Sequence, residues 1–483
     1  MLFAAPAAAQ QAVTPGACEQ LASSLTLPNT TVTAAEARAA AEGLPAHCRV
    51  ALTIRPTSDS DIKSEIWLPL TGWNGKFLAV GNGAWGGSIQ YGALADSLRR
   101  GYAAASTDTG HAGNGASFAI GHPEKLIDFG YRSVHETAVQ GKATVKALYG
   151  AAPRFSYFNG CSGGGRQAFM EAQRYPEDFD GIVAGAPGYN RTDAAFQTIQ
   201  MIQATHKSPE SFIPADKYPA IRQAALNACD AKDGLKDGLI GDPTACRFDP
   251  GVLACTPASA EASAGCLTQP QIAAARMIYS PVVDASGKEV SAGLEPGSEM
   301  HWGSVSGHTP HGMYNDLLRF IVFKDPTWDY RTLDVSKHLD MARRADNGIL
   351  AATSTDLTPF ANRGGKLLIY HGWEDQNIPP RSSVSYYTQL LATMGRRGED
   401  AVKLYMVPGM GHCGGGSGPN QFDMIAVLEQ WREHGRVPGA IIASRVEDGR
   451  VTRTRPLCPY PQLAKYKGSG SIDRAENFVC AAP

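Results

Sequence analysis

Short apolar and β-branched segments alternate with amphipathic helical segments in two parts of this chain of 483 residues. Strands are predicted at residues 76–80, 102–106, 154–158, 182–184, 366–370 and 402–407. Helices are predicted at residues 133–149, 166–175, 381–394 and 422–433. The helix at 133 is expected to begin with a capping box between Ser133 and Glu136. This alternation is typical of an α/β fold in which helices cover a parallel sheet.

The alternation is absent between Gly188 and about Asp356. That stretch contains four cysteines, many Asp, Gly and Pro residues, and scattered aromatic side chains. The length of the chain allows about three domains. Because the same alternation resumes after the gap, the pattern favours one sheet domain with a long insertion.

Composition and charge narrow the classes of function. The chain has 44 Lys and Arg against 46 Asp and Glu, a net charge of −2, so neither nucleic acids nor anionic membranes are expected as partners. No apolar run approaches the roughly 18 residues of a membrane-spanning helix. Residues 1–10 look like the end of a truncated secretory signal, which predicts a secreted or periplasmic protein; a disordered Ala-rich start is the alternative.

Ten cysteines support export, because disulfides persist in oxidising compartments. No Cys-x-x-Cys pair occurs, which argues against zinc ribbons and thioredoxin-like sites. Pairing by proximity in the sequence predicts the disulfides Cys18–Cys48, Cys229–Cys246, Cys255–Cys266 and Cys458–Cys480. Cys161 and Cys413 are then left over, far apart in the sequence.

The segment Gly160-Cys-Ser-Gly-Gly164 satisfies the pattern Gly-x-Ser-x-Gly between a predicted strand and a predicted helix. In that context the glycines permit a sharp turn that presents the serine hydroxyl at the end of the sheet. Ser162 is therefore the candidate nucleophile, and an ordinary Gly/Ser turn is the alternative.

A serine nucleophile needs a base and an acid that orients the base, and in α/β-hydrolases both follow on loops after later strands. Asp375 and His412 each follow one of the last two predicted strands. We assign Asp375 as the acid and His412 as the base, because histidine can take and return a proton near neutral pH. Glu374 is the rival acid and His371 the rival base.

The two leftover cysteines stand beside two of these residues, since Cys161 precedes Ser162 and Cys413 follows His412. A disulfide holds its two Cα atoms roughly 5.5 to 6 Å apart. A Cys161–Cys413 bond would therefore fasten the serine turn to the histidine loop. Two free thiols are the alternative.

Three segments together resemble one known family: GCSGGGRQ at 160–167, GWED at 372–375 and GMGHC at 409–413. They are similar to the characteristic blocks of the tannase and feruloyl esterase family, which also contains the hydrolase of mono(2-hydroxyethyl) terephthalate. The resemblance implies a serine esterase that hydrolyses esters of aromatic carboxylic acids. Together with the expected export, it predicts a secreted enzyme that cleaves feruloyl, hydroxycinnamoyl or galloyl esters. A monoester of the mono(2-hydroxyethyl) terephthalate type is the alternative substrate.

The resemblance also implies an α/β-hydrolase fold with a large inserted lid domain. The catalytic domain would comprise residues 1–188 and 357–483, and the lid residues 189–356. The expected partner is a small aromatic ester, the expected assembly a monomer or weak homo-oligomer, and no organic cofactor is expected.

By the same resemblance, the backbone amides of Gly163 and Gly83 would hold the oxyanion that forms when Ser162 attacks an ester. The loop at 81–85 reads GNGAW instead of the Gly-Asn-Gly-Gly form expected for the family. Ala84 is therefore an alternative second donor.

Acidic residues gather in the insertion at 229–239, which reads CDAKDGLKDGL. Carboxylates and main-chain carbonyls are the ligands of hard cations, although a solvated acidic turn has the same pattern. The resemblance favours a structural Ca²⁺ site closed by the Cys229–Cys246 disulfide. Its expected ligands are Asp230, Asp233, Leu235, Asp237 and Leu239, the leucines through their carbonyls.

An NAD-dependent dehydrogenase is the remote alternative, because residues 81–86 also match Gly-x-Gly-x-x-Gly, and Asp108 follows about 20 residues later. Gly92 would interrupt the helix that such a site requires.

Arg191 and Arg319 could meet a substrate carboxylate or phenol but are expected to be solvated surface charges. The aromatic residues that could line a pocket or fill the core are Trp85, Tyr189, Trp302, Phe320, Phe323 and Trp328.

Overall fold

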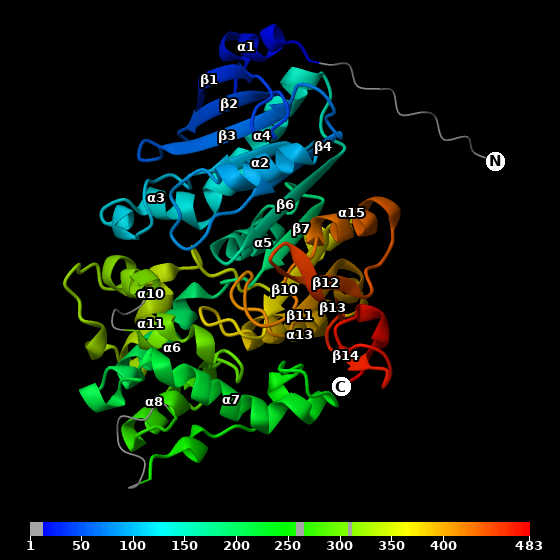
Figure 1. Ribbon diagram of the computed structural model, residues 1–483. Helices are drawn as coiled ribbons and strands as arrows, with labels where there is room; N and C mark the ends of the chain where they lie inside the picture. Colours follow the sequence, from blue (N-terminus) through cyan, green and yellow to red (C-terminus); the bar gives the residue numbers. More distant parts are fainter. Residues whose placement is uncertain (1–12, 257–264, 308–311) are drawn as a thin grey trace.

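The computed structural model describes residues 13–256, 265–307 and 312–483, so the expected signal remnant at 1–10 lies outside the described residues. A sheet with the strand order β1-β2-β3-β5-β4-β6-β7-β10-β11 forms the centre of the molecule (Figure 1). In that order the strands are Thr30–Arg38, His47–Ile54, Ile62–Pro69, Ala103–Thr107, Lys76–Val80, Phe155–Cys161, Gly181–Gly185, Lys366–Gly372 and Val402–Val407.

The sheet is mostly parallel, as predicted. Strands β5, β4, β6, β7, β10 and β11 are parallel to one another, whereas the pairs β1–β2, β2–β3 and β3–β5 are antiparallel. The antiparallel edge was not predicted. Its first strand is rich in alanine, and its burial alternates only over the first four residues. Its sequence therefore lacks the clean alternation of apolar and polar residues by which a strand is recognised.

Alternate residues of β4 show that both faces of the sheet are buried. Phe77 and Ala79 pack in one apolar cluster with residues of α4, α5 and α13, whereas Leu78 and Val80 pack in a second with residues of α2 and α15. Successive side chains of a strand point to opposite faces, so this strand lies between two helical layers. The helices outside the insertion are α1 (Pro15–Ser24), α2 (Tyr91–Arg99), α3 (Pro123–Ile127), α4 (Ser133–Tyr149), α5 (Gly163–Arg174), α12 (Thr358–Asn362), α13 (Arg381–Met394), α14 (Arg396–Ala401) and α15 (Met424–His434).

The capping box expected at Ser133 is wrong. The chain is already helical through a π-helical turn at Asp128–Arg132, and Arg132 has αR dihedral angles. Ser133 therefore lies within a continuous helix, where no free amide awaits its hydroxyl. The predicted end is confirmed, because Gly150 takes a left-handed conformation with φ 73°.

The segment between Gly188 and Asp356 contributes no described residue to the central sheet. Its helices lie together beside the carboxyl ends of the strands (Figure 1). They enclose one apolar cluster of their own and share a second with residues of the sheet domain, among them Trp85 and Phe129. Its elements are α6 (Arg191–Thr205), α7 (Tyr218–Cys229), α8 (Gln269–Tyr279), β8 (Val282–Val283), β9 (Glu289–Ser291), α9 (Gly303–Ser306), α10 (Gly312–Asp316) and α11 (Val335–Asp346). Two hairpins near the C-terminus complete the fold: β12 (Ile441–Glu447) with β13 (Arg450–Leu457), and β14 (Leu463–Tyr466) with β15 (Phe478–Ala481).

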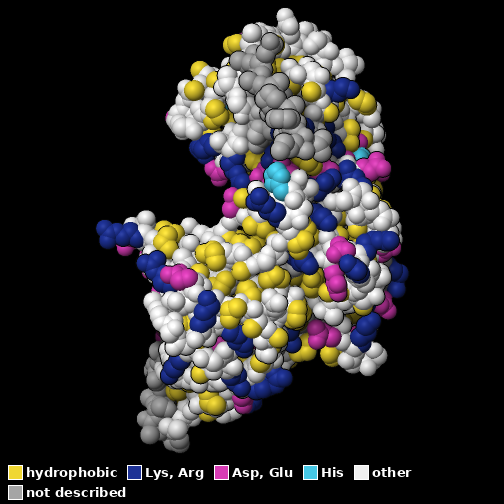
Figure 2. Space-filling model, turned by 90° about the vertical axis from the view of Figure 1, so that its right-hand side faces the viewer, with side chains coloured by type: hydrophobic (Ala, Val, Ile, Leu, Met, Phe, Trp, Pro, Cys, Tyr) yellow, Lys and Arg dark blue, Asp and Glu magenta, His cyan; other side chains and the backbone are white. Residues whose placement is uncertain are grey.

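Five disulfides connect the chain in the pairs expected from the sequence: Cys18–Cys48, Cys161–Cys413, Cys229–Cys246, Cys255–Cys266 and Cys458–Cys480. Within the described ranges, no helix is both long and apolar enough to cross a membrane. On the face shown in Figure 2, positive and negative side chains are interspersed among apolar and uncharged ones.

Candidate active site

Ser162 occupies a sharp turn between the end of β6 and the start of α5. Its backbone has φ 64° and ψ −117°, a region that non-glycine residues seldom adopt and that stores strain at functional sites. The turn needs glycine on its strand side, because a Cβ on Gly160 would lie 2.6 Å from the backbone of Gly164. The strand, turn and helix expected from the sequence are therefore present.

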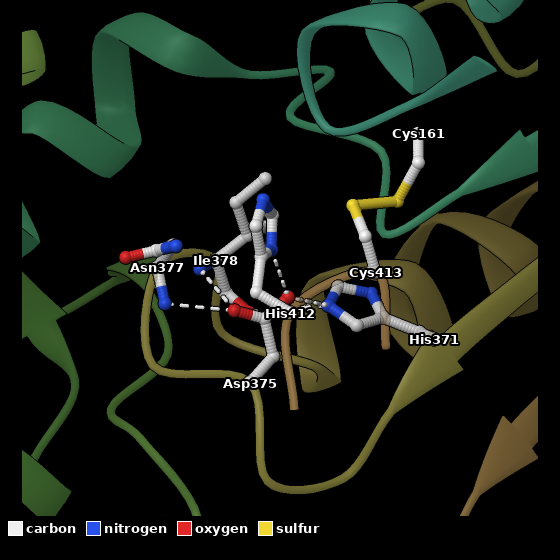
Figure 3. The surroundings of a disulfide bond; sticks show 7 residues. All are labelled: Cys161, His371, Asp375, Asn377, Ile378, His412 and Cys413. Atoms are coloured by element: carbon white, nitrogen blue, oxygen red, sulfur yellow. Dashed lines mark hydrogen bonds and ion pairs between the residues drawn. A yellow bond between two sulfur atoms is a disulfide. The ribbon is translucent and has the colours of Figure 1, made fainter. Parts of the chain in front are cut away.

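Asp375 and His412 meet because their loops follow the neighbouring strands β10 and β11. His412 Nδ1 lies 2.7 Å from Asp375 Oδ2 (Figure 3). The other carboxylate oxygen accepts hydrogen bonds from the amides of Asn377 (2.7 Å) and Ile378 (3.0 Å). The carboxylate is inaccessible to solvent, so the loop fixes both its position and its orientation toward the imidazole.

The electrostatics of this pair suit an acid that stays ionised and a base that it supports. Burial would raise the pKa of Asp375, but the adjacent His412 and His371 hold that pKa well below its ordinary value. Burial would lower the pKa of His412, yet the Asp375 carboxylate raises it above its ordinary value of 6.5. Asp375 is thus an anion that stabilises the protonated form of His412.

His371, the rival base, is fully buried and contacts the same carboxylate. Its Nε2 lies 3.0 Å from Asp375 Oδ2, and its Nδ1 lies 2.8 Å from Ser383 Oγ (Figure 3). With both ring nitrogens engaged in the interior, His371 supports the acid and is not placed to accept a proton from Ser162. This contact was not predicted from the sequence.

Glu374, the rival acid, turns away from His412 toward the inserted segment. Its Oε1 accepts hydrogen bonds from Arg222 Nη2 (2.9 Å) and Ser417 Oγ (3.0 Å). Adjacent residues of the same loop therefore have different partners, and only Asp375 reaches the imidazole.

The disulfide between Cys161 and Cys413 joins the serine turn to the histidine loop. Its Cα atoms are 6.0 Å apart, and Figure 3 shows it beside His412 and Asp375. Ser162 and His412 line one open cleft of about 700 Å³. The disulfide thus holds the two loops at the rim of a shared cavity.

Small and uncharged residues line this cleft in the described part of the chain. Besides Cys161, Ser162, His412 and Cys413, the lining consists of Gly83, Ala84, Gly86, Gly87, Ser88, Gln90, Gly113, Asn114, Met313 and Asn377. The six aromatic candidates are not among these described residues; Trp85 and Trp302, for example, are fully buried in apolar clusters. The amide side chains were missed because nothing local marks a loop residue that faces a cleft.

The glycine-rich loop 81–87 lies against the start of α5. A Cβ on Gly163 would be 3.1 Å from the amide nitrogen of Ala84 and 3.0 Å from Asn82 O. Asp108, the supposed ribose-binding residue, instead accepts hydrogen bonds at 2.8 Å from the amides of Lys63 and Gly110. The loop therefore borders the serine turn.

The expectation of a solvated Arg191 is wrong, because its residue exposure is 4%. Its guanidinium donates to Ala84 O at 2.8 Å and stacks over the Trp85 ring at 4.1 Å. Arg319 is half-buried and contacts Pro326 O and the Phe320 ring. The burial of a lone arginine depends on packing between distant segments, which the local sequence does not reveal.

The acidic residues of the insertion lie on one tight loop, where their carboxylates have separate partners. Asp230 accepts hydrogen bonds from the amides of Asp237 (3.1 Å) and Gly238 (2.9 Å), and Asp237 pairs with Arg455. A Cβ on Gly241 would lie 2.3 Å from Asp233 Oδ2. In the described ranges, no three His, Cys, Asp or Glu side chains form a group that could hold a metal ion.

The parallel sheet, the serine turn and the acid and histidine loops after successive strands define an α/β-hydrolase fold. Residues 48–481 match the family described as tannase and feruloyl esterase. An uncharacterized esterase of Xanthomonas campestris is 39% identical and covers 96% of this chain and 91% of its own. The mono(2-hydroxyethyl) terephthalate hydrolase of Piscinibacter sakaiensis is 35% identical, with coverages of 93% and 87%.

Among solved structures, feruloyl esterase B from Aspergillus oryzae superposes with a TM-score of 0.92 at 30% identity, over 97% of this chain and 100% of that chain. The chain belongs to the tannase and feruloyl esterase family. Its activity is that of a carboxylic ester hydrolase.

Proposed function

We propose that this protein is an exported serine esterase that cleaves feruloyl, hydroxycinnamoyl or galloyl esters through a triad of Ser162, His412 and Asp375. The observation that carries the proposal is the 2.7 Å contact of His412 with Asp375, made at the cleft that Ser162 also lines. Five disulfides support an oxidising compartment.

In this mechanism His412 accepts the Ser162 proton as the hydroxyl oxygen attacks the ester carbonyl. The resulting oxyanion is held by the amide of Gly163 and by that of Gly83 or Ala84, and each such donor lowers the barrier by about 3 kcal/mol. Collapse expels the alcohol, which takes the proton from His412. Water then attacks the acyl-enzyme with His412 as base, releasing the aromatic acid.

The cleft favours neutral esters over a monoester that bears a free carboxylate. No Lys or Arg is among the cleft-lining residues that the structure describes. We therefore expect methyl ferulate or methyl gallate to have a higher kcat/KM than mono(2-hydroxyethyl) terephthalate. A panel of these three esters and chlorogenate tests the proposal. If the protein hydrolyses none of the four, the proposal is refuted.

The pH profile follows from the raised pKa of His412. Only the neutral imidazole can accept the serine proton, so activity is lost as pH falls through that pKa. We expect kcat/KM to fall on acidification with a midpoint above 6.5, because kcat/KM reports the free enzyme. In Asp375→Asn the cause of the shift is removed, and any residual activity should have a lower midpoint. A flat profile down to pH 5 would contradict His412 as the base.

The Cys161–Cys413 disulfide closes a loop of 252 residues. In the chain-entropy description a bond that closes a loop of this length stabilises the fold by about 5 kcal/mol, and small misplacement of reacting groups lowers turnover by about 100-fold. We expect the double variant Cys161→Ala/Cys413→Ala to lose both stability and kcat. The matched control Cys458→Ala/Cys480→Ala should lower Tm with little change in kcat. Wild-type kcat in a folded Cys161→Ala/Cys413→Ala variant would refute this role.

We also propose that the acidic loop binds a structural Ca²⁺ through Asp230, Asp233 and Asp237 and the carbonyls of Leu235 and Leu239. The donor set is suited to a hard cation, and the loop is closed by the Cys229–Cys246 disulfide. The Asp237 carboxylate pairs with Arg455 in this structure. To bind the ion, it would have to turn away from Arg455. When bound, the ion would stabilise the insertion and take no part in ester cleavage.

Chelation should lower the Tm of the wild-type protein, and added Ca²⁺ should restore it. The variant Asp233→Asn should respond less to both, because it lacks one charged ligand. Differential scanning fluorimetry measures both effects. A wild-type Tm unmoved by chelator and by Ca²⁺ would show that the loop is an ordinary acidic turn.

A further inference from the structure

Three successive carbonyls of the glycine-rich loop accept hydrogen bonds from side chains that lie outside the loop. The pairs are Arg191 Nη2 with Ala84 O (2.8 Å), His111 Nε2 with Trp85 O (2.8 Å) and Thr109 Oγ1 with Gly86 O (3.2 Å). Since a carbonyl oxygen only accepts, His111 carries its hydrogen on Nε2. Its Nδ1 then accepts, and it lies 3.2 Å from Thr109 Oγ1, whose hydroxyl hydrogen is shared between this nitrogen and Gly86 O. The loop is thus fixed one peptide at a time by donors from two different segments.

The three donors are all buried, with residue exposures of 4% for Arg191, 8% for His111 and zero for Thr109. Burying a guanidinium is costly unless its hydrogen bonds and packing compensate, and Arg191 has another nitrogen, Nη1, without a hydrogen-bond partner. Thr109 has φ 62°, which is strained for a β-branched residue. Because the fold tolerates these costs, we infer that this particular loop conformation has a role in function.

Ala84 shows what the donors hold in place. It has φ 46° although it is not glycine, and it lines the cleft with Gly83. A planar peptide unit joins each carbonyl to the N–H of the next residue. Fixing the carbonyls of Ala84 and Trp85 therefore fixes the two peptide units that follow Ala84 and restricts the ψ angle of Ala84, beside the candidate amides. The amides then keep one direction without reorganising during the reaction, which is the condition for strong oxyanion stabilisation.

We propose that Arg191, His111 and Thr109 are positioning residues that hold the loop so that its amides face the oxyanion. Arg191 begins α6, so the inserted segment completes the oxyanion hole of the sheet domain. Trp85 Nε1 also donates to Met313 O of that segment at 2.9 Å, which adds a second connection. This proposal rests on the proposed function, since the oxyanion forms only if Ser162 attacks an ester.

Arg191→Met keeps much of the side-chain volume but removes the hydrogen bond to Ala84 O. We expect kcat to fall by about 100-fold, as for loss of an oxyanion donor, with KM nearly unchanged. Arg191→Lys should recover part of the loss, since it retains a charged donor without the planar stack. The affinity for an aryl boronic acid, which mimics the tetrahedral oxyanion, should fall in parallel with kcat/KM, while inhibition by ferulic acid should not change.

Arg174 offers an exposed control with the same kinds of contact, because it donates to Gly348 O at 2.7 Å and lies over the Tyr131 ring at 4.3 Å. Arg174→Met should keep kcat and boronate affinity whatever its effect on Tm. If Arg191→Met does not fold, the isosteric Thr109→Val tests the same proposal by removing the donor to Gly86 O.

Wild-type kcat and boronate affinity in folded Arg191→Met or Thr109→Val would overturn the positioning role. A boronate affinity that falls no further than the affinity for ferulic acid would also overturn it, because the loss would then be general. Undiminished hydrolysis in Ser162→Ala would refute the proposed function instead, so the two failures are distinguishable.

Discussion

Ser162→Ala is expected to lower kcat for an aromatic ester by about 10⁶-fold, the loss found when the nucleophile of a serine triad is removed. The reason is chemical, because no other group at the turn between β6 and α5 can form the acyl-enzyme. The residual rate would come from the oxyanion amides and from substrate binding, which the alanine leaves in place.

The Ser162→Ala protein should remain folded. The change removes only a hydroxyl group at the cleft, and alanine can adopt the same backbone conformation as serine. Circular dichroism and Tm establish this before kinetics are measured. A folded variant with kcat within tenfold of the wild type would show that another residue is the nucleophile.

Asp375→Asn is expected to lower kcat by about 10⁴-fold, the effect of this change in a serine triad. The amide cannot stabilise the imidazolium, and it favours the wrong tautomer of His412. Its Oδ1 can still accept the amides of Asn377 and Ile378, so the loop should keep its shape.

Glu374→Gln is the matched control, since the two carboxylates are adjacent on one loop. Glu374 contacts Arg222 and Ser417 instead of the imidazole, so we expect kcat to stay within a few-fold of the wild type. Tm should fall, because Arg222 loses the charge of its buried partner. The opposite result, with Glu374→Gln inactive and Asp375→Asn active, would reverse the assignment of the acid.

Local sequence patterns were sufficient to predict the strands and helices of the part of the fold in which a parallel strand and a covering helix alternate regularly. The strands at 76–80 and 402–407 and the helix at 381–394 were predicted with the bounds that the structure shows. The edge strand β1 was not, because its alanines carry little apolar signal. The helix start at Ser133 failed for another reason: the capping pattern says nothing of helical residues that precede it.

For the candidate site, residue type and chain order were enough to bring Asp375 and His412 together, because adjacent parallel strands place their following loops side by side. The contact of His371 with Asp375 and the burial of Arg191 could not be predicted in this way. Both depend on which distant segments pack against the loops, and a single histidine or arginine carries no signal of its tertiary partner.

Trapping of the acyl-enzyme tests the central claim most directly. The protein is mixed with excess methyl ferulate, quenched in acid during turnover, digested and analysed by mass spectrometry. We predict a feruloyl adduct on the peptide that contains Ser162, absent from Ser162→Ala and increased in amount in any variant whose deacylation is slowed. An adduct on a different residue, or rapid turnover by Ser162→Ala, would contradict the account.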